Sequence, residues 1–529
     1  MSSFFPFQIV DLFSGPGGLS EGFASFKDGK QFKIIVSAEM DPIAHKTLML
    51  RAYFRLLNSE APDHKKDYYD YCNGISKKPY SNVTEHLWNK AKKEANCLTL
   101  GDEKDNFKLD TMIKDRLLSN QPWVLIGGPP CQAYSLAGRS RNMGKTDYKA
   151  EEDHRHFLYL EYLRIIQKNR PTVFVMENVK GILSSQVNGE KIFPKILKDL
   201  EAPDLALNKA DTGLRYNIFS LVADEEQDFE LIPNDVDPKK YIIRAEHYGI
   251  PQARHRVILL GVLENKNTPV IKLKKLEKRR EVTVSEVIGT LPKLRSKLSK
   301  SKDSPEKWCL EILDQIEAIE TPAVARGRSE ITERVRFIRE KLGEILETGD
   351  LRYIKNKNEG KTGTSELDDW FLDSQLNVWL NHETRGHMPS DLRRYLYASV
   401  YADANNRSPR GHLEFNLPGL SPDHKNWETG KFCDRFKVQV KHAPSTTITS
   451  HISKDGHYFI HPDPHQCRSL TVREAARLQT FPDNYFFEGN RTQQYHQVGN
   501  AVPPLLASQI AAIVSDALEQ NTKVVSTQR

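Results

Sequence analysis

The fold and the chemistry of this chain both centre on Trp123-Val124-Leu125-Ile126-Gly127-Gly128-Pro129-Pro130-Cys131-Gln132. The apolar run 123–126 predicts a buried strand. The two glycines and two prolines after it predict a tight, rigid loop. In an open α/β fold, such a loop lies at the carboxyl edge of the sheet, where ligands bind. A cysteine beside a turn is often only a small buried hydrophobe, so a reactive thiol needs support from the rest of the chain.

Other short apolar runs predict further strands of the same sheet, with helices between them. The predicted strands are 7–13, 34–39, 173–176 and 257–260, and the predicted helices begin at Leu19 and Leu158. Strands that alternate with helices are typical of a doubly wound, mostly parallel sheet. We therefore expect an α/β fold with a Rossmann-like domain.

The α/β pattern fades after about residue 262, which predicts a second, smaller domain. Basic runs at 272–280 and 293–302 suggest a linker, and the chain from there to about 440 is charged and irregular in pattern. Regular structure returns near Ser469, where Thr471 and Glu474 form a capping box. The expected units are an α/β domain over 1–264, a second domain and return segment over 265–496, and a C-terminal helix over 497–529 that completes the α/β domain.

Composition narrows the class of protein. At 529 residues the chain is too long for one ordinary core. Its apolar runs are shorter than the roughly 18 residues of a membrane span, and its first residues lack a signal-type pattern. The six cysteines form no Cys-x-x-Cys pair, which suits a reducing cytoplasm. A net charge of +6 permits a polyanionic partner without requiring one.

A glycine loop, Ser14-Gly15-Pro16-Gly17-Gly18, follows the first predicted strand. Backbone N–H groups at such a strand-to-helix turn can hold a nucleotide-like ligand. The loop lacks the triphosphate-binding pattern, and Ser20 occupies the third glycine position of the dinucleotide fingerprint. Glu39 ends the next strand, where a ribose-hydroxyl acceptor belongs. Gly18-Leu19-Ser20-Glu21-Gly22 also matches the hydrolase elbow, but Ser20 falls within the helix, where a solvated or capping role is expected.

Acidic and basic residues lie at the ends of two other predicted strands. Glu177 directly follows the strand 173–176, where partial desolvation could raise its pKa and let it donate a proton. Gln252, Arg254 and Arg256 alternate, so that they face one side of an extended chain. Two cations entering a buried strand need anionic or carbonyl partners. A solvated acid and a structural ion pair remain the alternatives for these two groups.

Taken together, these motifs resemble those of the cytosine C5 DNA methyltransferases, enzymes that use S-adenosylmethionine. The matching motifs, in the order of that family, are Asp11-Leu12-Phe13-Ser14-Gly15-Pro16-Gly17-Gly18, Pro129-Pro130-Cys131-Gln132, Glu177-Asn178-Val179, Gln252-x-Arg254-x-Arg256, Arg473 to Pro482, and Gly499-Asn500-Ala501-Val502-Pro503-Pro504. They span residues 7 to about 515.

The resemblance implies covalent catalysis on a flipped-out cytosine. The Cys131 thiolate would attack C6, with Pro130 and Gln132 beside it in the catalytic motif. Glu177 would hold N3 and the exocyclic amine, and Arg256 would contact O2. Arg254 would brace the site. The activated C5 would take the methyl group, and loss of the C5 proton would release the thiolate.

The resemblance also implies a cofactor site at the carboxyl edge of the sheet. Phe13 would lie against the adenine, and Glu39 would bind the ribose. The other residues implied are Ser14, Gly15, Gly17, Gly18, Met40, Asp102, Pro129, Leu158, Asn500 and Ala501. Met40 stands where the family often has an aromatic residue, and Asp102 belongs to a short, degenerate motif. The stretch between Glu39 and Asp102 is longer than is usual for the family.

The implied partner is double-stranded DNA, bound by a monomer in the cytoplasm, and a cognate restriction endonuclease would be consistent with the family. We expect no membrane association. His461, His465 and Cys467 lack the ligand spacing of a zinc site, so no metal is expected. An RNA cytosine methyltransferase and a catalytically dead, nucleic-acid-binding methylase fold are the alternatives. The large middle region argues against the first, and the presence of Cys131, Glu177 and Arg256 argues against the second.

Overall fold

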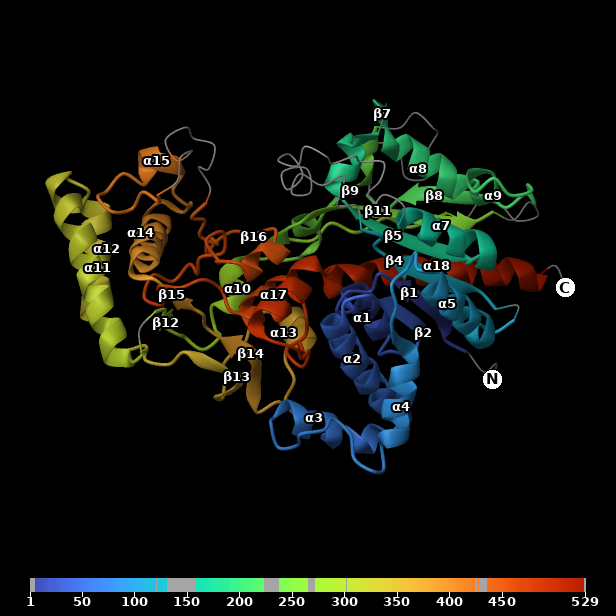
Figure 1. Cartoon of the computed structure of the whole chain (residues 1–529), viewed down its shortest axis with the longest axis horizontal. Coiled ribbons are helices and arrows are strands. Elements are labelled where there is room, and N and C mark those ends of the chain that lie inside the picture. Colours follow the sequence, from blue (N-terminus) through green and yellow to red (C-terminus); the bar gives the residue numbers. More distant parts are fainter. Residues whose placement is uncertain are drawn as a thin grey trace.

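The computed structural model has two lobes, a sheet with flanking helices on the right of Figure 1 and a helical lobe on the left. The described residues are 5–119, 121–130, 158–187, 189–222, 237–264, 272–300, 302–423, 427 and 435–527. Cys131 and Gln132 lie outside these residues, and the two prolines before them lie within.

The right-hand lobe is built on one sheet with strand order β3-β2-β1-β4-β5-β11-β8, and β9 pairs with β11. Its strands are β1 (Phe7–Leu12), β2 (Phe32–Glu39), β3 (Ala95–Cys97), β4 (Trp123–Gly127), β5 (Val173–Val179), β8 (Tyr216–Ser220), β9 (Ile242–Arg244) and β11 (His255–Leu263). The first five in spatial order are parallel, and β11 runs antiparallel to β5 and β8. The order reverses at β1 and β4, which places a ligand crevice at their carboxyl ends.

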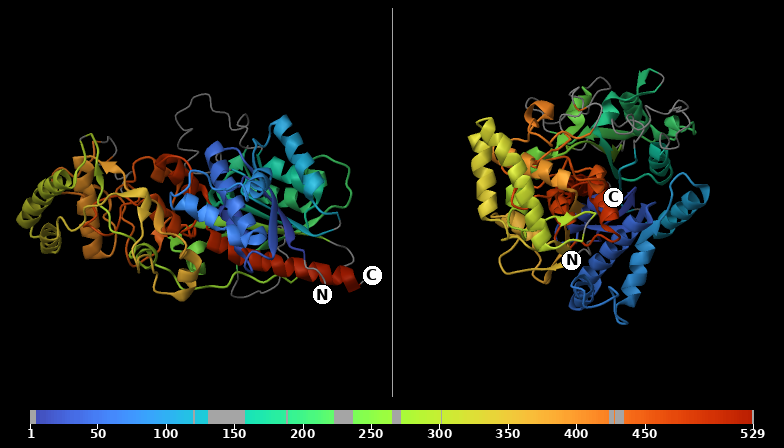
Figure 2. Two further views of the ribbon diagram at one scale, coloured as in Figure 1. Left: turned by 90° about the horizontal axis from the view of Figure 1, so that it is seen from below. Right: turned by 60° about the vertical axis from the view of Figure 1, so that its left-hand side comes forward.

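Helices cover both faces of this sheet, as expected for a doubly wound fold. One face packs against α1 (Gly18–Ser25) and α18 (Pro504–Thr527), and the other against α5 (Glu103–Arg116), α7 (Leu158–Asn169) and α8 (Ile192–Glu201). The predicted apolar stripe of the last helix, which includes Leu506, Ile510 and Ile513, is buried in the first of these cores. Figures 1 and 2 show α18 running along the sheet.

The stretch between β2 and β3 forms a helical insertion of its own. It contains α2 (Pro42–Glu60), α3 (Lys66–Cys72) and α4 (Glu85–Glu94), which share a core with β14 (Val378–Glu383). The Tyr69 hydroxyl donates to Asp373 at 2.6 Å, and the Tyr71 hydroxyl donates to Glu488 at 2.6 Å. The insertion therefore contacts two segments that are 304 and 417 residues away in sequence.

The left-hand lobe corrects the expectation of an irregular middle region. It contains the long helices α11 (Pro305–Ala325), α12 (Ser329–Glu340) and α14 (Pro389–Asn405), which enclose a separate core. Smaller elements connect it to the sheet lobe: α10 (Val284–Ile288), α13 (Ser365–Phe371), β10 (Gln252–Ala253), β13 (Gly349–Ile354), β16 (Ser445–Thr446), α16 (Val472–Leu478) and α17 (Arg491–Asn500). These helices are amphipathic, and their many charged surface residues weaken the apolar periodicity by which a helix is predicted from sequence.

The basic run 272–280 is also not a free linker. Leu273 and Leu276 are buried in the core of the sheet lobe, and the Lys275 ammonium donates to the carbonyl of Ser220 at 2.6 Å. Arg279 and Arg280 pair with Glu366 and Glu286. The run therefore packs along the sheet lobe, and Lys275, Arg279 and Arg280 have partners within the fold.

Three buried arginines on and beside α16 connect the return segment to the rest of the chain. Arg477 pairs with Asp483 at 2.6 Å, Arg468 pairs with Glu474 at 2.7 Å, and Arg473 donates to three backbone carbonyls. All three guanidinium groups are fully buried. A buried cation is tolerated only where such partners surround it, so α16 fixes the position of each segment that it contacts.

Gly22 sets the distance between α1 and α18. A Cβ atom built on Gly22 would lie 2.3 Å from the Pro504 carbonyl oxygen and 2.4 Å from the Ala507 Cβ. These atoms belong to the backbone and to a short side chain, so neither can rotate away. Only glycine allows the two helices to approach this closely.

We predict that Gly22→Ala lowers the free energy of unfolding by about 1–3 kcal/mol, because overpacking forces α1 and α18 apart. Urea denaturation monitored by circular dichroism would measure the change. Ser25→Ala on the same helix is the matched control and should change stability by less than about 0.5 kcal/mol. Equal stability of the Gly22 variant and the control would contradict the proposed close packing.

Candidate functional site at the carboxyl edge of the sheet

The glycine loop after β1 is tightly bent and is held by Glu39. Phe13, Gly15 and Gly17 all have positive φ angles, of 56°, 57° and 95°. The Gly15 N–H donates to Glu39 Oε2 at 2.7 Å, and the Asp41 N–H donates to Glu39 Oε1 at 2.8 Å. A positive φ at a bulky residue such as Phe13 is strained, and such strain concentrates at ligand sites.

The two predicted halves of the cofactor site meet at this loop. A Cβ atom on Gly18 would lie 2.3 Å from the Val502 carbonyl oxygen and 3.2 Å from the Ala501 Cβ. The Tyr485 hydroxyl donates to the carbonyl of Pro16 on the same loop. A Cβ atom on Gly15 would meet no atom of the described residues within 4 Å. Within the described part of the chain, the loop is therefore packed at Gly18 and open at Gly15.

The remaining predicted cofactor residues lie at the same edge. Asp102 caps the N-terminus of α5 by accepting from the N–H groups of Lys104 and Asp105. Leu158 begins α7, and its Cδ2 lies 3.7 Å from the Cβ position of Gly101. Met40 follows β2 and is 62% exposed.

Asn500 in the motif Gly499–Pro504 and Ser14 in the glycine loop each make polar contacts. The Asn500 amide lies 3.1 Å from the His496 ring at the end of α17. The Ser14 hydroxyl donates to the carbonyls of Asp11 and Ala38, so it supports the turn from beneath.

Ser20 corrects one sequence expectation. It is fully buried, and its hydroxyl donates to the Gly17 carbonyl at 3.1 Å. It is therefore neither solvated nor exposed at a sharp turn, as the hydrolase interpretation would require.

The loop after β4 lies directly against Glu177. A Cβ atom on Gly128 would be 3.0 Å from Glu177 Oε2, and the Asn178 amide donates to the Pro129 carbonyl at 3.2 Å. These contacts fix the described part of the catalytic motif, through Pro130, beside the acid motif on β5. The role of Asn178 was not predicted, although its place after Glu177 in the acid motif was a usable signal.

Glu177 and Arg256 form an ion pair at this edge. The Arg256 Nε lies 2.8 Å from Glu177 Oε1, and each side chain is 14% exposed. The antiparallel pairing of β5 and β11 opposes Arg256 to Val179 and Ile258 to Glu177, which brings the two side chains together. Burial lowers the pKa of Arg256, and the Glu177 carboxylate opposes that shift. A carboxylate and a guanidinium held this way can together bind a planar, polar ring.

Arg254 and Gln252 turn toward the return segment instead. Arg254 donates to the Ile448 carbonyl at 2.8 Å, and Gln252 accepts from the Ile448 N–H at 2.8 Å. Both side chains are buried, and burial holds the pKa of Arg254 well below its ordinary value. The two arginines therefore meet the two kinds of partner expected from sequence, a carbonyl for Arg254 and a carboxylate for Arg256.

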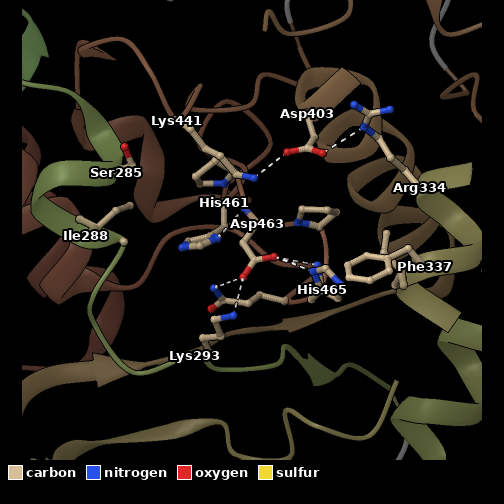
Figure 3. Close-up of a pocket in the computed structure, with 15 residues that line it drawn as sticks. Ser285, Ile288, Lys293, Arg334, Phe337, Asp403, Lys441, His461, Asp463 and His465 are labelled. Carbon is tan, nitrogen blue, oxygen red and sulfur yellow. Dashed lines mark hydrogen bonds and ion pairs between the residues drawn. The ribbon is translucent and has the colours of Figure 1, made fainter. Parts of the chain in front are cut away.

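A cavity of about 450 Å³ lies away from this edge and is lined by residues of α10, α12 and α14 and by residues 461–466. Figure 3 shows Asp403 between Lys441 and Arg334, at 2.6 and 3.0 Å. Asp463 holds His465 at 3.0 Å. Cys467 is buried and its thiol donates to the Leu392 carbonyl. Among the residues described, no three His, Cys, Asp or Glu side chains are grouped as metal ligands.

One segment, Arg491–Asn521, is long and apolar enough to cross a membrane on composition alone. In the fold, 72% of its most apolar window is buried. The core position of α18 accounts for its composition.

Comparisons with known proteins agree with the arrangement of the site. A family model for C-5 cytosine-specific DNA methylase matches residues 67–206 and 235–515. The Type II methyltransferase M.Bpa9945I of Bacillus paralicheniformis is 31% identical over 96% of this chain and 99% of its own length. The Type II methyltransferase M.AgeI of Thalassovita gelatinovora is 26% identical over 75% of this chain and 83% of its own length.

A solved structure shares the fold. It is a prophage-encoded protein of Escherichia coli described as a DNA modification methyltransferase. The TM-score is 0.51 with 18% sequence identity, and the match covers 97% of this chain and 99% of the other.

Proposed function

The chain belongs to the C-5 cytosine-specific DNA methylase family and is a DNA (cytosine-5-)-methyltransferase, and we propose that it acts through a covalent Cys131 intermediate on a flipped-out cytosine. The observation that carries this mechanism is the Glu177–Arg256 pair beside the Gly128–Pro130 loop. Cys131 follows Pro130 directly in the sequence and itself lies outside the described residues.

The proposed chemistry follows from the residue types. The Cys131 thiolate adds to C6 of cytosine, and electron density moves to C5 and toward N3. Glu177 stabilises this charge by hydrogen bonding or proton sharing at N3, and Arg256 stabilises it at O2. Removal of the C5 proton after methyl transfer then expels the thiolate. The target carbon is inaccessible in a stacked duplex, so the cytosine must leave the helix.

We propose that S-adenosylmethionine binds at the glycine loop, because members of this family are S-adenosylmethionine-dependent. The open space above Gly15 and the carboxylate of Glu39 fit a nucleoside at this edge. Phe13, Leu158 and Ala501 would border it, with Ser14, Gly17, Gly18, Met40, Asp102, Pro129 and Asn500 around them. When bound, the sulfonium supplies the methyl group.

We propose that the helical lobe selects the DNA sequence. Its core is separate from the sheet cores, whereas residues 272–291 and 448–502 contribute side chains to the core of the sheet lobe. An independent core can vary without disturbing the catalytic edge. The proposed division keeps 1–264 and 497–529 in the catalytic domain and places recognition within 265–496.

The relatives named Type II methyltransferases support a role in restriction and modification. We propose that the enzyme acts on double-stranded DNA as a monomer in the cytoplasm, beside an endonuclease of the same specificity.

We predict that Cys131→Ser loses nearly all methyl transfer, because a serine hydroxyl is far less ionised than a thiol with a pKa of about 8.5. DNA containing 5-fluorocytosine should trap the unaltered enzyme as a covalent adduct, since fluorine blocks loss of the C5 substituent. Denaturing electrophoresis would detect the adduct. Equal trapping by the Ser variant would assign the nucleophile elsewhere.

We predict that Glu177→Gln lowers the single-turnover rate by roughly 100-fold or more, the scale of general acid–base assistance. DNA affinity, measured by gel shift, should change much less. Glu190→Gln, at an exposed position on a neighbouring segment, is the matched control and should keep its full rate. An unaltered rate for Glu177→Gln would reduce this residue to a structural acid.

We predict that exchanging residues 302–346 and 388–438 for those of a relative with another target changes the sequence that is methylated. These boundaries keep β13, β14 and the residues that pack on the sheet lobe. Sequencing of methylated plasmid would identify the new target. Exchange of 61–84 in the helical insertion is the control and should leave the target unchanged. An unaltered target in the lobe chimera would place recognition in the sheet lobe.

A further inference from the structure

Asp11, near the end of β1, has a buried carboxyl group without a partner. Its side chain is 1% exposed, and neither carboxylate oxygen has a hydrogen-bond partner in the described part of the chain. The nearby hydroxyls of Ser20 and Ser14 moderate the rise that burial causes in the pKa of Asp11, but they donate to the backbone carbonyls of Gly17 and Asp11. Most buried carboxyl groups are paired or hydrogen-bonded, because desolvating an unpaired charge is costly.

The surroundings of Asp11 do not neutralise it. Ser37, its register partner on β2, is also buried, and its hydroxyl lacks a partner among the described residues. Arg55 on α2 attracts Asp11 electrostatically, but its guanidinium pairs with Glu94 and lies 3.9 Å from Glu21. The other titratable groups that interact with Asp11 are Glu39 on β2, Tyr162 on α7 and Tyr485 on the return segment. None of them adds a positive charge.

The unpaired position has an energetic consequence. Burial raises the pKa of Asp11 to about 7. The folded pKa therefore exceeds the unfolded value of about 3.9. Asp11 then costs stability that grows as pH rises from about 4 to about 7 and is largest above 7. A residue that destabilises the free protein at working pH, at the edge of a ligand site, is a candidate for a functional role.

The position of Asp11 suggests that role. It lies two residues before Phe13, on the strand that leads directly into the glycine loop. A charge in a water-excluded interior acts on a neighbouring charge far more strongly than it would in water. S-Adenosylmethionine carries a positive sulfonium, whereas S-adenosylhomocysteine, the product of methyl loss, is a neutral thioether of otherwise identical structure.

We propose that Asp11 is an electrostatic selectivity residue that favours the sulfonium cofactor over its neutral thioether product. The inference rests on the proposed function of the glycine loop as the cofactor site. Asp11 touches neither ligand. It acts through space from beneath the loop, so that binding strengthens when the sulfur is charged and weakens once the methyl group has been transferred.

Isothermal titration calorimetry on Asp11→Asn at pH 8 tests the proposal with three probes. S-Adenosylmethionine and sinefungin, which carries an ammonium group near the sulfonium position, should bind about tenfold more weakly than to the unaltered enzyme. S-Adenosylhomocysteine should change by less than about twofold. Asp110→Asn, which removes a surface-paired carboxylate on α5, is the matched control and should change none of the three. Equal weakening of all three probes by Asp11→Asn overturns the proposal.

Thermal unfolding of the free protein gives a second readout, in which the variant should gain stability although it loses affinity for the charged ligands. Asp11→Asn should raise the melting temperature at pH 8, because it removes an unpaired buried charge. If Asp11 had a merely structural role, the substitution would lower the melting temperature. A lower melting temperature together with unchanged probe selectivity would make Asp11 a structural residue.

The unaltered enzyme provides a test that needs no variant. Its preference for S-adenosylmethionine over S-adenosylhomocysteine should fall as pH is lowered from 8 to 6. The preference is the ratio of the two dissociation constants. Titration of the amino and carboxyl groups that both ligands carry affects both constants alike and cancels in this ratio. Near pH 7, binding of the sulfonium form alone should release protons, seen as buffer-dependent heats. A flat ratio overturns the selectivity. If the unaltered enzyme binds none of the probes, the proposed cofactor site itself is wrong.

Discussion

The architecture depends on the burial of three arginines on and beside α16. Arg468, Arg473 and Arg477 lose their water entirely, and each must therefore find acceptors within the fold. Arg477 reaches Asp483 and the carbonyls of Val287 and Gly360. Because removing any one acceptor would leave a buried donor unsatisfied, the segments that supply them are held in place together.

This network connects the return segment to the catalytic edge. Arg473 donates to the Tyr485 carbonyl, and the Tyr485 hydroxyl donates to Pro16 in the glycine loop. On the other side, Gln252 and Arg254 hold the backbone of Ile448. The glycine loop and the arginine motif are thus supported by a segment more than 190 residues away from either. Such support keeps a strained loop in one conformation without any contribution from ligand.

The site contains two kinds of buried charge, one paired and one unpaired. Glu177 and Arg256 neutralise each other at the edge, and in the proposed mechanism each exchanges its partner for the cytosine ring. Among the described residues Asp11 has no such partner. Its unpaired charge therefore destabilises the fold, whereas the acceptors around the α16 arginines satisfy theirs. The contrast is physically sensible, because a charge that is already paired has little field left to act on a ligand.

The amino-acid sequence by itself determined the sheet strands, the glycine loop and the terminal helix, because apolar periodicity and glycine positions are local signals. The capping box at Thr471 and the burial of Leu506 and Ile510 were predicted for the same reason. Family resemblance predicted which residues would gather at the carboxyl edge, and Gly18, Glu39, Glu177 and Arg256 do lie there.

Only the tertiary structure decided the rest. The helical lobe was missed because its charged helices weaken the apolar pattern. Ser20 was expected to be solvated or capping, because its burial depends on tertiary packing that no local pattern shows. The partners of the α16 arginines lie up to 190 residues away, and the isolation of Asp11 follows from what its neighbours bind elsewhere. Pairing of charges is a property of three-dimensional neighbourhoods, and no local sequence pattern specifies it.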